Sequence, residues 1–176
     1  MDSNRKFNRA DIPYYQEWIR KVSGRKRISV LPTSIDDMVA LFPFCRVYGD
    51  GETDEEAKKR HLDYFKFGIG WADSIGKNIL LNVERIERLQ HGKACYVKAI
   101  LLHEAGHIIN PRDKHGKSGC EFIAELYALK KACRLGLEAE LKEIRLNSSR
   151  WYLDSIGVNS KMYKIAFRML KGVGVY

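Results

Sequence analysis

The stretch 94-ACYVKAILLHEAGH-107 decides the fold of this 176-residue chain. It contains no proline, and its apolar residues fall on nearly all sides of a helix, which is the pattern of a buried helix. A helix brings residues four apart onto one face, so we expect His103 and His107 to direct two imidazoles to the same point. Glu104 follows one residue further round the same helix.

Two neutral imidazole nitrogens are good ligands for zinc, and His-Glu-x-x-His on a helix is the arrangement found in zinc peptidases. In such a site, a third protein ligand joins the two histidines and one position stays open for water, which loses a proton near neutral pH. Glu104 is then the base that accepts this proton. The alternative is that His103 and His107 are core residues hydrogen-bonded without a metal.

A second helix follows, and it supplies candidates for the third ligand. Ser118-Gly119-Cys120-Glu121 resembles a capping box at its start. Glu121 and Glu125 share one face of this helix. If it packs against the motif helix, Glu121 can bind zinc while Glu125 accepts a hydrogen bond from the outer nitrogen of a ligating histidine. Small side chains at Ala124 and Ala128 would let the two helices approach closely.

The motif and the second helix together resemble a known family. His-Glu-x-x-His followed by 121-EFIAELYA-128 is similar to the Glu-x-x-Ala-(Asp/Glu/Asn)-x-aromatic-Ala signature of gluzincin metallopeptidases. In size and layout the chain resembles small soluble members, such as ImmA/IrrE-type peptidases encoded near phage and mobile-element repressors, and other phage-type minimal gluzincins. The resemblance covers residues 78–136, and within it 78-NILLN-82 resembles the strand that usually precedes the motif helix.

This resemblance implies an activity and a set of site residues. It predicts a zinc-dependent endopeptidase that hydrolyses peptide bonds of a protein or peptide substrate. It also implies that zinc (Zn²⁺) is held by His103, His107 and Glu121 and that Glu104 is the catalytic base. Glu125 accepts a hydrogen bond from the outer nitrogen of a ligating histidine.

Other residues compete for the third ligand position. Glu125 itself is one, and His115 is another, although it also fits a solvated loop histidine. Asp113 is a third, because residues 107–113 resemble the turn after the motif in metzincins, with Asn110 where glycine is usual. The sequence leaves these alternatives open, and it does not choose between Tyr127 and Tyr152 as a donor to an oxyanion.

Composition and charge limit the number of domains, the location of the protein and its partners. The length and the 45% hydrophobic content predict a single domain over residues 1–176. We expect a cytoplasmic protein that does not enter a membrane, with four scattered cysteines, at 45, 95, 120 and 133, as buried free thiols. The net charge of +9 is uneven, with eight basic and three acidic residues in 1–27, which predicts a weak contact of a basic surface with nucleic acid or an acidic protein.

The pattern of turns and apolar periodicity predicts the order of elements. Helices are expected over 11–22, from Ser34 to Phe42, from Thr53 to about Leu62, over 84–90, in the motif region, from Ser118 towards Gly136, and from Ser160; strands are expected over 27–31, 45–48, 64–72 and 78–83. This order predicts an α+β, zincin-like fold, with a small mixed sheet followed by a helical half, in which the last strand borders the cleft. The alternative function is a non-catalytic basic regulatory or nucleic-acid-associated protein with the same fold and a structural or vestigial zinc site.

Overall fold

The computed structural model describes residues 5–34, 36–37, 53–73, 76–88, 94–110, 116–137 and 168. Within them, a three-stranded sheet has the order β1 (Ser29–Thr33), β3 (Asn78–Asn82), β2 (Gly70–Asp73). Strand β3 pairs in parallel with β1 and antiparallel with β2, so the sheet is mixed. The described elements therefore form an α+β structure, as the sequence predicts.

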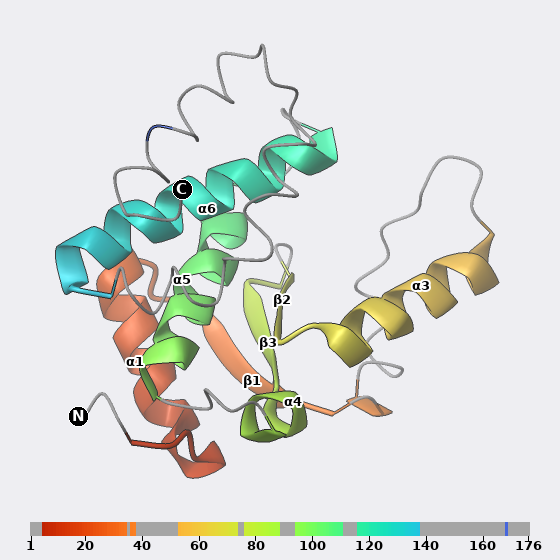
Figure 1. The fold of residues 1–176 in the computed structure, drawn as a ribbon, viewed down its shortest axis with the longest axis horizontal. Coiled ribbons are helices and arrows are strands. Elements are labelled where there is room, and N and C mark those ends of the chain that lie inside the picture. Colours follow the sequence, from red (N-terminus) through yellow and green to blue (C-terminus); the bar gives the residue numbers. More distant parts are fainter. Residues whose placement is uncertain are drawn as a thin grey trace.

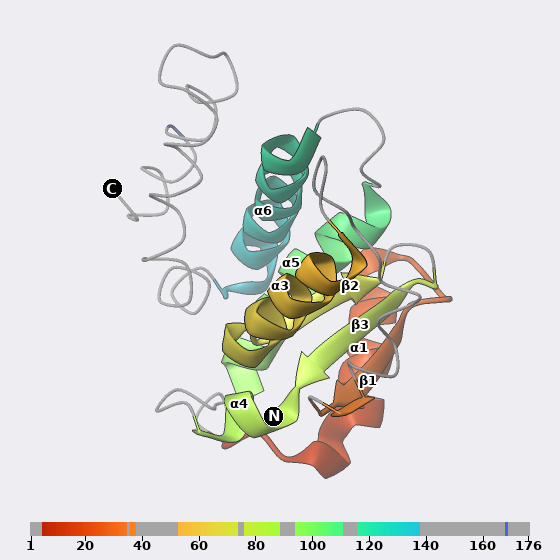
Figure 2. The same cartoon turned by 90° about the vertical axis from the view of Figure 1, so that its right-hand side faces the viewer.

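Helices lie on both sides of this sheet (Figure 1). Helices α1 (Ile12–Ser23) and α5 (Ala94–Ile109) pack on one side, and α6 (Gly116–Leu135) crosses α5 (Figure 1). Helix α3 (Asp54–Phe67) lies on the opposite side of the sheet (Figure 2). The short elements η1 (Arg9–Asp11) and α4 (Val83–Arg88) precede α1 and follow β3.

The main core lies between the sheet and the helices α1, α5 and α6. Helix α5 supplies the largest share of it, because its apolar residues are buried on nearly all sides, as expected for a helix without a polar stripe. Its fully buried members are Val97, Ala99, Leu101, Leu102 and Ala105. The motif helix is therefore also the central helix of the core, which gives its polar side chains a fixed frame.

Local signals explain where several helices begin and end. Helix α1 has Pro13 in its first turn and ends at Gly24, whose φ of 71° suits glycine. Helix α3 starts from a capping box, in which the backbone N–H of Thr53 donates to the Glu56 carboxylate at 2.9 Å. Helix α6 ends at Gly136, with φ of 65°. These predicted helices are confirmed, as is α4.

The hairpin before the motif helix differs from the prediction. Residues 64–67, expected in a strand, complete α3 instead, and β2 begins only at Gly70. The capping box and the acidic first turn of α3 favour helix, which continues until Gly68. The last strand, β3, is central in the described sheet and is paired on both sides, so it has no free edge to which an added strand could pair.

Strand β1 lies at one edge of the described sheet. The N–H of Ser29 donates to the carbonyl of Lys77 at 3.1 Å, on the β3 side, so the N–H of Val30 points outward. It donates to the side-chain oxygen of Gln16 in α1 at 3.0 Å. The next outward position is Pro32, which has no N–H.

The predicted strand over 45–48 falls outside the described residues. Of the helix predicted from Ser34 to Phe42, residues 36–37 are described and helical, and of the helix predicted from Ser160, residue 168 is described and helical. Helix α6 begins at Gly116, so Ser118 lies inside its first turn and is not the N-cap residue. Cys133 is a free thiol, but it is exposed rather than buried. Among the helices of the described part, none is long and apolar enough to cross a membrane.

Candidate metal centre

Helix α5 places the two histidines of the motif inside the molecule. His103 is 3% exposed and His107 is 8% exposed. Their rings meet edge to face, and the two Nε2 atoms lie 3.1 Å apart. The helical spacing of four residues thus produces the predicted convergence of two imidazole nitrogens at one point.

Glu125 of α6 fixes the orientation of His103. Its Oε2 lies 2.8 Å from Nδ1 of His103, and its side chain is 5% exposed. An ionised carboxylate only accepts hydrogen bonds, so Nδ1–H of His103 is the donor. The Nε2 of a neutral His103 then carries a lone pair, directed towards His107. This contact is the one that the spacing of the second helix predicts for Glu125.

The contact between α5 and α6 depends on two small residues. A Cβ built on Gly106 would lie 2.7 Å from both Cα and the carbonyl oxygen of Ala124, closer than real Cβ contacts allow. Only a glycine at this position permits the observed approach, which brings Glu125 within reach of His103. The expected role of Ala124 in close helix packing is present, and Gly106 is its counterpart on α5.

Glu104 faces the sheet rather than α6. A Cβ on Gly70 of β2 would lie 2.8 Å from Cγ2 of Ile100 and 3.2 Å from Cγ of Glu104, so the strand runs directly against the motif helix here. Glu104 is 9% exposed, and no side chain in the described ranges forms a hydrogen bond or ion pair with its carboxylate. A nearly buried carboxylate without a partner among the described side chains is costly to hold unless it serves a ligand or a reaction.

Zinc fits the arrangement of the two histidines. An ion bound tetrahedrally by two imidazole nitrogens, each at about 2.0–2.1 Å, separates those nitrogens by about 3.3–3.4 Å. The observed separation of 3.1 Å is close to this value, and Glu125 supplies the outer hydrogen bond usual for a ligating histidine. Two neutral histidines sharing a hydrogen bond would also meet at this distance.

The third ligand is not among the described side chains. Within the ranges that the structure describes, no group of three or more His, Cys, Asp or Glu side chains is placed to hold a metal ion. Glu121 lies on α6, one turn before Glu125, but its side chain is outside the description, as are the whole residues Asp113 and His115. The assignment of zinc ligands therefore stays a prediction for all of these residues.

Tyr127 lies away from the two histidines. It follows Glu125 by two residues, which is about 200° round the helix. Its ring is 5.8 Å from the amine of Lys131, and that amine donates to the carbonyl of Val22 at the end of α1. Burial raises the pKa of the Tyr127 hydroxyl, and the positive charge of Arg25 opposes this rise. These contacts do not support Tyr127 as an oxyanion donor; Tyr152 is outside the described residues.

Sequence reasoning did not identify Gly70 as a neighbour of Glu104. The only signal was a pair of glycines in 67-FGIGW-71, which permits close backbone approach but names no partner. Comparison of this chain with known protein families, with curated proteins and with solved structures gives no significant match.

Proposed function

We propose that this protein is a zinc-dependent endopeptidase of the gluzincin type, with a zincin-like fold. One observation carries the proposal: Nε2 of His103 and Nε2 of His107 lie 3.1 Å apart, while Glu125 holds the opposite nitrogen of His103. In this proposal, His103, His107 and Glu121 would hold the zinc ion. Bound zinc would supply a Lewis acid that lowers the pKa of a water molecule and polarises the scissile carbonyl.

Glu104 performs the proton transfers in this proposal. Its carboxylate accepts a proton from the attacking water and returns it to the nitrogen of the leaving amine. Its position supports this role, because it is one residue from His103, nearly buried, and without a hydrogen-bond partner among the described side chains. Glu125 keeps Nδ1 of His103 protonated, and so keeps Nε2 available as a ligand atom.

Strand β2 is suited to bind an extended peptide beside Glu104. The carbonyl of Ile69 accepts from Asn82 of β3 at 3.0 Å, so the alternate residues Gly70 and Ala72 direct their backbone N–H and C=O groups to the other edge. In the described sheet, no strand pairs with that edge. A peptide added there would pass next to Gly70, the residue that contacts Glu104. The substrate is therefore a protein segment in extended conformation.

The substitution Glu104→Gln tests the proposal. It removes the base and keeps the shape of the side chain, so zinc content should stay near one per chain while cleavage falls by about 100-fold or more. The measurement is digestion of a proteome-derived peptide library by zinc-loaded protein, with products identified by mass spectrometry. Glu87→Gln, on an exposed face of α4, is the matched control and should cleave like wild type.

Two results would contradict the proposal. If the zinc-loaded wild type cleaves no peptide, the protein is not an endopeptidase of broad sequence specificity. The non-catalytic alternative with a structural zinc site then becomes the better explanation. If wild type and Glu104→Gln cleave equally, Glu104 is not the base.

A further inference from the structure

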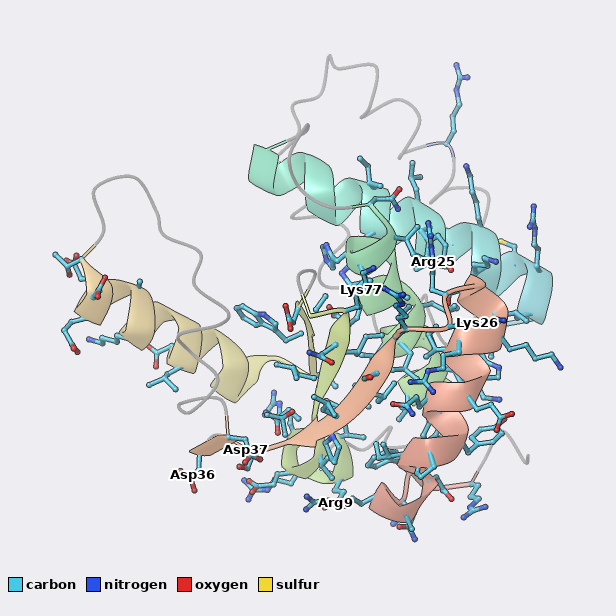
Figure 3. The ribbon with its side chains drawn as sticks, turned by 180° about the vertical axis from the view of Figure 1, so that it is seen from behind. Arg9, Arg25, Lys26, Asp36, Asp37 and Lys77 are labelled. Carbon is cyan, nitrogen blue, oxygen red and sulfur yellow. The ribbon has the colours of Figure 1, made fainter. Side chains whose placement is uncertain are left out.

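Four exposed cations from two separate turns lie together at one end of the sheet. Arg25, Lys26 and Arg27 form the turn between α1 and β1, and Lys77 lies in the turn between β2 and β3. The hydrogen bond from the N–H of Ser29 to the carbonyl of Lys77, at 3.1 Å, joins the two turns. Figure 3 shows Arg25, Lys26 and Lys77 near this end of the sheet, with Arg9 near its other end. We call these four residues the basic cluster.

The first turn of the basic cluster is held firmly at both ends. The N–H of Arg25 donates to Oγ of Ser23 at 3.1 Å, and the N–H of Ile28 donates to the carbonyl of Arg25 at 3.3 Å. The side chain of Ile28 is fully buried, and its carbonyl accepts from Nε of Arg20 at 2.6 Å. Lys26 and Arg27 therefore occupy the centre of an ordered turn. Little conformational entropy of the backbone is lost when their side chains bind a ligand.

Lys77 occupies a backbone conformation that its residue type does not favour. Its φ is 58°, in the left-handed region where glycine and asparagine are usual and other residues are disfavoured by about 1 kcal/mol or more. No other described residue apart from glycine has a positive φ. Strained positions of this kind cluster at functional sites. At position 77 the side chain adds a fourth positive charge beside the first turn.

The charges of the basic cluster are uncompensated within the described residues. None of its four side chains forms an ion pair there. The closest acidic residue in the second turn is Asp73, whose carboxylate accepts from the N–H of Gly76 and from Nδ2 of Asn78, both at 2.9 Å. Asp73 is therefore engaged in forming the turn, and the cluster presents net positive charge to solvent.

The composition of the two turns favours phosphate as the partner group. All six residues at 24–27 and 76–77 are exposed, and none is apolar or aromatic. A protein interface normally has an apolar or aromatic centre, and binding of single-stranded nucleic acid uses aromatic stacking. Two arginines and two lysines without such residues match the phosphates of a duplex backbone, to which guanidinium groups bind through paired hydrogen bonds.

We propose that the basic cluster binds the phosphate backbone of duplex nucleic acid without reading its sequence. This inference does not depend on the proposed peptidase activity. It gives the chain a second binding surface, built from α1, the sheet turns and their charges.

Fluorescence anisotropy tests this proposal with labelled 20-base-pair duplexes, one of DNA and one of RNA. The variant R25A/K26A/R27A/K77A removes the cluster, and the control K6A/R9A/K59A/R88A removes four exposed charges elsewhere, so both have the same net charge. At about 50 mM salt, we expect the cluster variant to bind either duplex at least about 10-fold more weakly than the control. The slope of log affinity against log salt should fall by about 3–4 in the cluster variant alone.

Far-UV circular dichroism shows whether each variant is folded. The variant K26A/K77A, which keeps both arginines, provides a milder test with about half the loss in slope. Equal weakening in the cluster variant and the control would overturn the proposal, because binding would then follow total charge. Absence of binding by wild type at about 50 mM salt would also overturn it. Tighter binding of a fluorescent polyglutamate than of either duplex would assign the cluster to an acidic protein partner instead.

Discussion

At the scale of single residues, a hydrogen bond distinguishes the two glutamates of α6. The carboxylate of Glu125 accepts from His103, whereas Glu121 is one helical turn away. One carboxylate cannot easily accept a hydrogen bond from Nδ1 of His103 and also bind the zinc ion on the Nε2 side of the same ring. The contact of 2.8 Å therefore favours Glu121, one helical turn earlier, as the third ligand over Glu125.

Substitution of each candidate should rank the ligands. His107→Ala and Glu121→Ala should both reduce zinc affinity severely, because two protein ligands rarely hold zinc tightly. Glu125→Ala should reduce it by about 10–100-fold, the usual cost of losing the partner of a ligating histidine. Asp113→Ala and His115→Ala are the matched controls and should bind like wild type. Competitive titration with a zinc chromophore measures all five; if Asp113 or His115 proves the costliest loss, the gluzincin assignment fails.

The sequence predicts part of this site and not the rest, for a reason that lies in distance along the chain. The convergence of His103 and His107 follows from helix geometry within five residues, and the contact of Glu125 follows from one assumption, that two consecutive helices pack together. Gly70 in β2 lies against Glu104 in α5, far along the chain. The periodicity of apolar residues within one element does not predict such a contact. The third ligand falls outside what the structure describes.

At the scale of elements, the crossing of α5 and α6 depends on Gly106. In an unobstructed helix, Gly106→Ala would stabilise the protein by about 1 kcal/mol, because alanine has the higher helix propensity. Here the new Cβ meets the backbone of Ala124 at 2.7 Å, and backbone cannot move aside like a side chain. We expect the opposite sign, a loss of about 1–3 kcal/mol in the free energy of unfolding. Urea denaturation checks it, and any stabilisation would contradict the observed crossing.

The approach of β2 to α5 gives a second prediction at this scale. Gly70→Ala places a methyl group 2.8 Å from Cγ2 of Ile100 and 3.2 Å from Cγ of Glu104, so the glutamate must shift. The distance of 3.2 Å requires a shift of Glu104 of only a few tenths of an ångström. If Glu104 is the base, kcat should therefore fall by up to about 10-fold, since misplacement of a catalytic group by a full ångström costs about 100-fold. Zinc content, measured by mass spectrometry of the metal, should not change. An unaltered kcat would show that the strand does not position Glu104.

The boundaries of elements show where sequence patterns succeed. Terminal glycines placed the C-terminal ends of α1 and α6 correctly, because these signals act within a few residues. The capping box predicted at Ser118 did not place the start of α6, which begins at Gly116. The aromatic run at 64–67 favoured a strand, but the helix begun by Thr53 and Glu56 extends through it to Phe67. The central position of β3 depends on its parallel pairing with β1, a contact between distant segments that turn signals do not determine.

At the scale of the whole molecule, the same helix is both the centre of the core and the carrier of the candidate site, so metal binding should act on global stability. A ligand that binds only the folded state at 1,000 times its Kd adds about 4 kcal/mol to the free energy of unfolding. For a chain of this size, that corresponds to a rise in Tm of about 8–16 °C. Differential scanning calorimetry with zinc and with a chelator measures the shift. His107→Ala should show no shift, and an equal Tm of wild type in both conditions would argue against zinc.

The edges of β1 and β2 differ in the backbone N–H groups that are available for pairing with another chain. On β1, the outward N–H of Val30 is already bound to Gln16, and Pro32 has none to donate. Unpaired donors at a sheet edge are the template on which proteins aggregate by adding strands from other molecules. Strand β1 is thus protected against self-association, whereas β2 keeps its outward groups at Gly70 and Ala72. In the described sheet, the edge beside Glu104 is therefore the one on which the proposed peptide substrate can pair, and the opposite edge resists growth into a polymer.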